Sequence, residues 1–373
     1  MNCINHSSSK RIVSFNEICS SNFIDLYKSI EYERNIFLCD VVDGTPIYKQ
    51  SKNIGGTLSL IEEFTRRIEA GDKAFILLNR SGKVILEKNA LTKYYRSMAT
   101  FLSEYSTNKV YSLYVQIFFD TCIKKKNLSY TDFPEKVGES TVRGKMGWEI
   151  FNDVVEQLRT VMAGRDFKEK IYKQTELFKK GFNSSKKYID ALFEKYARIL
   201  VIRVDFAFRT DGSKNDKLIC LDEAQSSFSR FLNNKRSKVI YKNLIGYIWR
   251  LESGERKGYH YHLFFFFDGS RSHKDAYLAK QIGEDWELVT GWRGIYYNCN
   301  AHKQKYKRLA IGMISHSDVK ERETILQVLA YMHKEDQLLR ERYARKARTW
   351  GRGEMPAIST GRTGRPRRIE SLS

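Results

Sequence analysis

The sequence predicts an α+β fold: a central, mainly antiparallel sheet flanked by helices, preceded by a separate mixed α/β N-terminal region. Beyond about residue 195, segments rich in β-branched and aromatic residues alternate with segments of helical spacing. Two of the strand-like segments are separated only by a short polar loop with a glycine near each end, which favours an antiparallel hairpin. At 373 residues, the chain is also longer than one typical domain.

Residues 1–145 are predicted to form the N-terminal α/β region. Helical spacing runs over 57–69 and ends at Ala70-Gly71, which suits a helix C-cap. Residues 74–78 and 84–86 are apolar and flank a short turn sequence, so they predict a hairpin. No chemical motif occurs in this region, and the sequence does not indicate its role.

Residues 146–345 are predicted to form the second domain, which begins with helical spacing up to about residue 195. A series of strand, helix, strand, strand, helix, strand and helix follows. These elements are a strand over 198–208, a helix over 222–234 with Asp222 as N-cap, strands over 245–251 and 259–267, a helix over 273–290 closed by Gly291, a strand over 308–314, and a long helix from 318 to about 348.

The composition indicates a polyanionic partner. The formal net charge is +21, and a strongly cationic surface binds polyanions in a salt-dependent way, which makes nucleic acid the leading candidate. An anionic membrane surface is second, but no basic amphipathic helix with a lipid-facing stripe is evident. The six cysteines are scattered without a CxxC pair, and neither a signal peptide nor a membrane-spanning segment is evident. We therefore expect a soluble protein of the bacterial cytoplasm.

Basic residues near the C-terminus are candidates for phosphate contacts. Residues 346–373 are rich in arginine and glycine and are predicted to form a flexible basic tail. This tail and a second basic segment are expected to set affinity for DNA rather than sequence choice. The candidate DNA-binding residues are Lys303, Lys305, Lys307, Arg308, Arg345, Lys346 and Arg348.

The most informative motif is a pair of histidines, His260 and His262, on a predicted strand. Alternate side chains of a strand share a face, so these two imidazoles point the same way and could hold a divalent cation. If Glu252 pairs across the hairpin with His260, a carboxylate joins them. A slip of one residue would place Glu252 on the other face. Half-buried histidines that only form hydrogen bonds remain the alternative.

A metal beside a basic surface suggests phosphodiester chemistry, which also needs an attacking group. On a helix, Tyr331 and Lys334 are neighbours, and the ammonium could favour the phenolate. Tyr277 and Tyr343 show the same spacing to a lysine. Tyr331 is favoured because it falls in the middle of the predicted long helix, beside an apolar stripe.

The order of these motifs resembles that of HUH endonucleases, the rolling-circle replication initiators and relaxases. Within them, the chain resembles the YagK/YfjJ family, which is similar to the gene-two replication proteins of filamentous phages (inoviruses). The similarity covers about residues 145–368. The motifs that carry it are Arg203-Val-Asp205, Leu251-Glu-Ser-Gly254, Gly258-Tyr-His-Tyr-His262, Tyr331-Met-His-Lys-Glu-Asp-Gln337 and Trp350-Gly-Arg-Gly353 with Gly364-Arg-Pro-Arg367.

The resemblance implies an HUH-type fold and a site-specific nickase of single-stranded DNA. His260 and His262 would hold Mg²⁺ or Mn²⁺, with Glu252 as third ligand. Tyr331 would attack the scissile phosphate, leaving a 5′-phosphotyrosyl link and a free 3′-OH, with help from Lys334.

The implied role is initiation of rolling-circle replication of a phage, plasmid or integrated element, with origin single-stranded DNA and a host helicase or polymerase as partners. Asp205 matches the family pattern and could orient a metal ligand. Position 335 is Glu335, so the enzyme would use a single tyrosine. A DNA-binding regulator without nicking activity is the alternative, and processing of single-stranded RNA is a third possibility.

Overall fold

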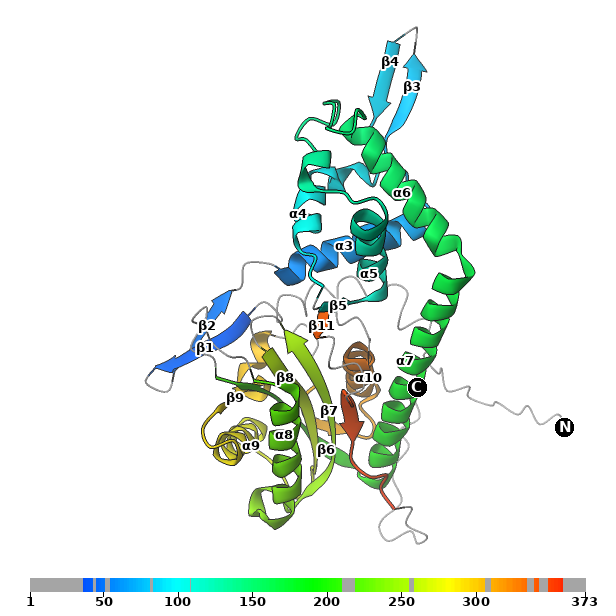
Figure 1. Cartoon of the computed structure of the whole chain (residues 1–373). Coiled ribbons are helices and arrows are strands. Elements are labelled where there is room, and N and C mark those ends of the chain that lie inside the picture. The colour runs from blue at the N-terminus through cyan, green and yellow to red at the C-terminus, as the bar shows by residue number, and fades with distance from the viewer. Residues whose placement is uncertain are drawn as a thin grey trace, which may run out of the picture.

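The computed structural model describes residues 36–42, 45–50, 54–80, 83–107, 109–209, 219–254, 258–305, 310–333, 339–341 and 348–357 (Figure 1). Two separate buried cores flank the sheet of the C-terminal part, and a third fills the N-terminal helical body. The long helix α7 (Arg165–Lys195) runs from the helical body to the sheet.

Helices form most of the N-terminal body, around an aromatic core that includes Phe64, Phe118 and Phe151. The rings of Phe64 and Phe118 meet edge to face with centroids 6.2 Å apart, an arrangement aromatic pairs prefer. Helix α3 confirms the predicted helix, and Gly71 after it adopts the left-handed φ of +91°. The helices are α3 (Ile54–Glu69), α4 (Met98–Ser103), α5 (Leu113–Phe119) and α6 (Gly147–Ala163).

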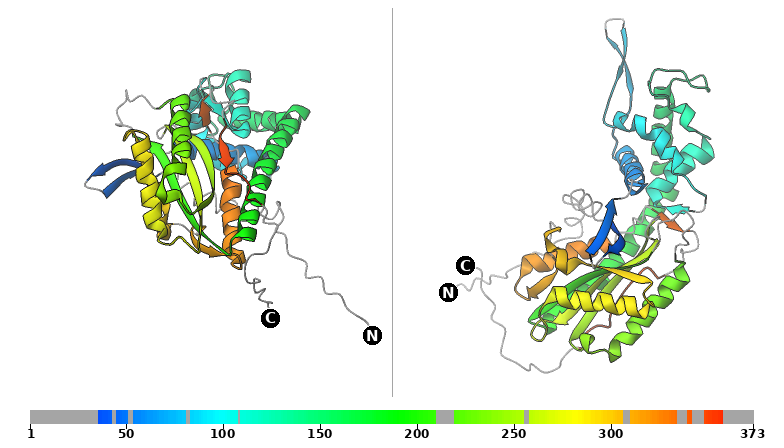
Figure 2. Two further views of the ribbon diagram at one scale, coloured as in Figure 1. Left: turned by 90° about the horizontal axis from the view of Figure 1, so that it is seen from below. Right: turned by 90° about the vertical axis from the view of Figure 1, so that its left-hand side faces the viewer.

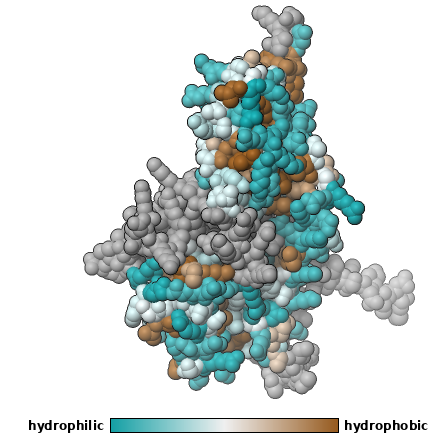
Figure 3. Space-filling model, viewed as in Figure 1, coloured by the Kyte–Doolittle hydropathy of each residue, from teal (hydrophilic) through white to brown (hydrophobic). Residues whose placement is uncertain are grey.

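The predicted hairpin is also confirmed, as β3 (Ile76–Arg80) paired antiparallel with β4 (Lys83–Glu87). It projects from the helical body (Figure 1), and Figure 3 shows hydrophobic surface on it. Leu77 and Ile85 are among its exposed side chains. A second hairpin, β1 (Ile36–Val42) with β2 (Thr45–Gln50), precedes α3.

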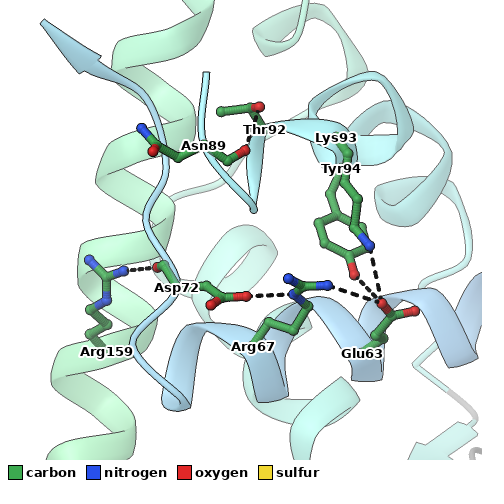
Figure 4. A network of polar contacts seen from close by, with 8 residues as sticks. All are labelled: Glu63, Arg67, Asp72, Asn89, Thr92, Lys93, Tyr94 and Arg159. Atoms are coloured by element: carbon green, nitrogen blue, oxygen red, sulfur yellow. Dashed lines mark hydrogen bonds and ion pairs between the residues drawn. The ribbon is translucent and has the colours of Figure 1, made fainter. Parts of the chain in front are cut away.

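A network of polar contacts ties α3 to its neighbours (Figure 4). The Tyr94 hydroxyl, from the 3₁₀ helix η1 (Thr92–Ser97), donates to Glu63 at 2.6 Å. Arg67 Nε donates to Asp72 at 2.6 Å, and Arg159 from α6 donates to the Asp72 carbonyl. Burial and the Glu63 carboxylate raise the pKa of Tyr94, so the phenol keeps the proton that it donates.

Helix α6, which follows the predicted domain boundary at 145/146, packs into the N-terminal helical body. Phe151, Val154 and Leu158 of α6 are buried in the N-terminal core. The chain turns at Gly164, and the far end of α7 packs Tyr188 and Phe193 into a core on the sheet. Helical spacing alone could not show which domain α6 belongs to, because an apolar helix face of this kind can pack against either core.

The C-terminal part contains an antiparallel sheet, as predicted, in the order β10-β6-β8-β7-β12 with β9 also paired to β6. Strands β9 and β12 were not predicted. The strands are β6 (Arg198–Phe208), β7 (Leu244–Gly254), β8 (Gly258–Asp268), β9 (Gly294–Asn298), β10 (Gly312–Ser315) and β12 (Trp350–Arg352).

Helices cover both faces of this sheet (Figure 2, left), which confirms the predicted α+β architecture. Phe265 and Phe267 of β8 point into the core under α8 (Leu221–Asn234) and α9 (Asp275–Val289). Phe264 and Phe266 point the other way, into the core under α7 and α10 (Val319–His333). The aromatic run of β8 is continuous because both faces of this strand are buried.

Two predictions about the helices were wrong. Helix α8 starts after Cys220, and Asp222 lies in its first turn instead of capping it. Helix α10 ends at His333 instead of continuing to about residue 348. Beyond His333 the sequence has few apolar residues at helical spacing, and strand pairing replaces the helix: β11 (Leu339–Glu341) pairs with β5 (Lys109–Tyr111).

Part of the predicted tail belongs to the sheet, since β12 pairs with β7. The rest of the tail, from residue 358, lies outside the described residues. Within the part of the chain that is described, no helix has both the length and the apolar character needed to cross a membrane.

A side chain completes one edge of β6. Strand β10 pairs with the first residues of β6 and β9 with the last ones, which leaves a gap at Ile202 and Arg203. The buried Asn300 fills it: its Oδ1 accepts from the Arg203 amide at 2.8 Å, and its Nδ2 donates to the Val201 carbonyl at 3.1 Å. The side-chain amide thus stands in for a strand.

We expect Asn300→Ala to lower the free energy of unfolding by about 1–3 kcal/mol, because it leaves buried backbone groups without partners. Urea denaturation followed by circular dichroism measures this. The matched control is Asn233→Ala, at an exposed position of α8. Equal stability of both variants would show that Asn300 does not support the edge.

His333 fixes the end of α10. Its Nε2 lies 2.7 Å from the Ser185 hydroxyl of α7, and its ring meets that of Trp350 with centroids 4.6 Å apart. A side chain at Gly181 would collide with this imidazole, since a Cβ there would lie 2.7 Å from Nδ1. Burial, with a contribution from the Arg250 charge, lowers the pKa of His333 to about 3.

We expect the free energy of unfolding to fall as pH drops from about 6.5 towards 3, because only the unfolded chain protonates His333 in that range. Above pH 6.5 the His333 ring is neutral in both the folded and the unfolded chain, so it no longer makes the free energy of unfolding depend on pH. His333→Gln should flatten the slope in pH-dependent urea titrations, whereas His273→Gln, at an exposed position, should leave it unchanged. An unaltered slope in His333→Gln would contradict the assignment.

Candidate metal centre

Strands β7 and β8 pair in the register that places Glu252 opposite His260, the pairing considered from the sequence. With His262 two residues further along β8, three potential ligands share one face of the sheet. One ligand atom from each residue lies within 4.8 Å of the others. The Glu252 carboxylate is 3.8 Å from His260 Nε2 and 3.6 Å from His262 Nε2.

The three side chains are largely withdrawn from solvent, with exposed fractions of 11% for Glu252, 12% for His260 and 18% for His262. Burying a carboxylate is costly unless positive charge or hydrogen bonds compensate it. Bonds of about 2.1 Å to a tetrahedral cation would place two ligand atoms about 3.4 Å apart. The separations of 3.8 and 3.6 Å between the Glu252 carboxylate and the two imidazoles need only a small contraction, so this donor set fits a divalent cation.

Backbone and side-chain acceptors orient both imidazoles. His262 Nδ1 lies 2.9 Å from an Asp205 carboxylate oxygen, within ion-pair distance, and His260 Nδ1 lies 3.2 Å from the Gly258 carbonyl. Both rings therefore turn Nε2 towards Glu252, as metal-binding histidines do when the other nitrogen is held. Arg203 in turn lies 3.6 Å from Asp205.

The electrostatics of His262 also favour a cation. Burial lowers the pKa of this imidazole, but the Asp205 and Glu252 carboxylates outweigh it and raise the pKa to about 9. A ring that holds a proton this tightly marks a point where positive charge is stabilised. A divalent cation can supply that charge in place of the proton.

Arg250 is a functional candidate that the sequence analysis missed. It pairs with His262 across the β7–β8 ladder, so the guanidinium lies on the same face as the three ligands. The residue is only 3% exposed, and its Nη1 lies 3.4 Å from the Thr349 hydroxyl. The register that identified Glu252 also places Arg250 here. A guanidinium beside a cation site suits a phosphate.

Helix α10 ends close to this group of residues. His333, its last residue, contacts Trp350 of β12, and Trp350 pairs with Arg250. Tyr331 is in the last turn of α10, on the face of the sheet that carries the metal ligands. Its side chain and all of Lys334 lie outside the described residues.

The structure separates Tyr277, one of the two other tyrosine candidates, from this arrangement. Tyr277 lies on α9, which covers the opposite face of the sheet, and its side chain is 57% exposed. Tyr343 lies outside the described residues.

Three of the predicted DNA-binding residues can be placed. Lys303 Nζ pairs with Asp275 at 2.5 Å, which gives this lysine a structural role. Lys305 Nζ lies 5.7 Å from the centroid of the Tyr297 ring, and the Arg348 guanidinium lies 5.7 Å from that of Trp249. The remaining residues, Lys307, Arg308, Arg345 and Lys346, lie outside the described residues.

A family model, the YagK/YfjJ C-terminal domain, matches residues 163–353, which is more than half of the chain. Searches of curated proteins and of solved structures gave no match. The matched segment starts one residue before the turn into α7 and ends just after β12, so it contains the entire sheet, the helices on both faces and the candidate metal centre. The chain therefore belongs to the YagK/YfjJ family.

Proposed function

We propose that this protein nicks single-stranded DNA in a metal-dependent transesterification and thereby initiates rolling-circle replication of a phage, plasmid or integrated element. The observation that carries the proposal is the convergence of Glu252, His260 and His262 on one point. The order of the motifs, which is similar to that of HUH endonucleases, and the net charge of +21 support a DNA substrate.

In this proposal Glu252, His260 and His262 hold the cation, and Asp205 keeps His262 in the tautomer that binds it. Mn²⁺ suits this site better than Mg²⁺, since imidazole is a better ligand for transition metals. When bound, the cation polarises a phosphate oxygen of the scissile group. The buried guanidinium of Arg250 contacts another oxygen of the same phosphate and stabilises its charge.

The nucleophile is the phenolic oxygen of Tyr331. It attacks the phosphorus, an O–P bond to tyrosine forms, and the bond from phosphorus to the 3′-oxygen breaks. The proton lost by the phenol ends on the departing 3′-oxygen, and Lys334 assists by favouring the phenolate. The products are a 5′-phosphotyrosyl strand and a free 3′-OH that a host polymerase can extend. The covalent link conserves the bond energy for later rejoining.

We expect one Mn²⁺ to bind per chain, with affinity reduced at least tenfold in His260→Ala and about 10–100-fold in Asp205→Asn. The reason is that Asp205 acts through His262, so its loss misaligns one ligand without removing it. Isothermal titration calorimetry measures both, with His273→Ala at an exposed position as control. Equal Mn²⁺ affinity in His260→Ala and wild type would remove the metal centre from the proposal.

We expect a covalent DNA adduct that requires both Mn²⁺ and Tyr331. The probes are single-stranded oligonucleotides tiled over the DNA that flanks the gene, labelled at the 3′ end because the adduct retains the 3′ fragment. A denaturing gel should show a shifted band with Mn²⁺ but not with EDTA. Tyr331→Phe should form it at least about 10³-fold more slowly, since no nucleophile remains.

Tyr277→Phe is the matched control and should form the adduct normally, because α9 lies on the other face of the sheet. An adduct that persists in Tyr331→Phe would assign the nucleophile to another residue. Sequence-specific binding without any adduct, over the full set of tiled oligonucleotides, would instead favour the DNA-binding regulator.

A further inference from the structure

One row of side chains crosses the sheet through the metal centre. Asp205 pairs with His262 on one side and with Tyr297 of β9 on the other, and His262 pairs with Arg250. Paired residues of antiparallel strands share a face, so Tyr297 lies on the face of the metal ligands. Strands are about 4.8 Å apart, which puts Tyr297 two spacings, about 10 Å, from His262.

The side chains of β9 confirm this orientation. Tyr296 packs into the core under α8 and α9, whereas Tyr297 packs against the core under α7 and α10. The Tyr297 ring is only partly buried there. It therefore borders the metal centre at the end of the row opposite to Trp350, which contacts the last residue of α10.

A second ring extends this aromatic surface. The imidazole of His302 stacks on Tyr297, with centroids 5.1 Å apart and planes inclined by 16°. His302 Nδ1 lies 2.9 Å from the Asn298 carbonyl, so it donates there and fixes the ring in this stack. His302 remains half-buried, in a kinked turn of η6 (Cys299–Lys305). Stacked, partly exposed rings beside a phosphate site suit an unpaired base.

A cation accompanies the two rings. Lys305 is exposed, and its ammonium lies 5.7 Å from the centroid of Tyr297. The nearby Lys303 pairs with Asp275. An aromatic platform together with a lysine matches the two chemical parts of a nucleotide, the base and the phosphate.

We propose that Tyr297, His302 and Lys305 form a nucleotide-binding subsite for the single strand that passes the metal centre. One base stacks on the His302–Tyr297 pair, and Lys305 contacts the adjoining phosphate. At the other end of the row, Trp350 packs against His333, so that ring supports the fold. The inference rests on the proposed function for its location beside a scissile phosphate, but binding at this subsite needs neither metal nor cleavage.

The test compares two 30-mers in EDTA by fluorescence anisotropy: oligo(dT) and a fully abasic strand that keeps the sugar-phosphate backbone. The wild type should prefer oligo(dT). His302→Ala and Tyr297→Leu should each bind oligo(dT) about tenfold more weakly, with less than a twofold change for the abasic strand. Lys305→Ala should weaken binding to both strands by the same factor and reduce the salt slope by about 0.7.

Two controls isolate the stacking. His302→Phe keeps a ring and should preserve the preference for oligo(dT). Tyr277→Leu removes an exposed tyrosine from the opposite face and should change neither affinity. Thermal melting checks that each variant is folded. If Tyr297→Leu is unstable, the comparison relies on His302→Ala.

Two results would refute the proposed subsite. One is equal affinity of the wild type for oligo(dT) and the abasic strand. The other is a His302→Ala variant that loses affinity for both strands equally or for neither strand. These outcomes are independent of nicking. Base-dependent binding through His302 without a tyrosine adduct would keep the subsite and refute the nickase. An adduct without that dependence would keep the nickase and refute the subsite.

Discussion

The pairing register of β7 with β8 determines both the packing and the chemistry of the C-terminal domain. In this register Phe265 and Phe267 enter one core, Phe264 and Phe266 enter the other, and Glu252 meets His260. A shift by one residue on β7 would turn Glu252 towards α8 and Trp249 towards α7. The buried aromatic side chains of β8 stabilise this register. Because the same register brings the three candidate ligands together, packing in the core also determines the geometry of the site.

Burial gives the candidate metal centre its electrostatic character. Two carboxylates, Asp205 and Glu252, face His262 within the same partly enclosed space, and the buried Arg250 follows on the next strand. Such a group of buried charges is stable only if opposite charges compensate one another at close range. Along this row a carboxylate, an imidazole and a guanidinium succeed one another on adjacent strands, and the Glu252 carboxylate lies beside the imidazole. An anionic substrate and a divalent cation would enter as a further pair of opposite charges.

The sequence predicted the local features well and the long-range ones poorly. Strand β6 and the β7–β8 hairpin followed from runs of apolar residues and a polar loop. The Glu252–His260 pair was one of two registers that the sequence left open, and the structure adopts it. The end of α10 was missed, because the pairing of β11 with β5 involves residues more than 200 positions apart. The role of Asn300 was also hidden, since an asparagine that replaces a strand has no sequence pattern. Arg250 could have been found from the same register as Glu252.

The pairing of β11 with β5 makes a second mechanical link between the two parts of the chain. Helix α7 is the first link, and between Phe167 and Gly181 none of its residues is fully buried. Strand β11 comes six residues after the end of α10, and its partner β5 leads into α5 of the N-terminal core. The helical body and the sheet are therefore joined at two places, along α7 and at the β5–β11 pair, and the second join follows directly on the helix that carries Tyr331. The N-terminal body thus restrains both ends of the chain segment that contains the candidate metal centre and α10.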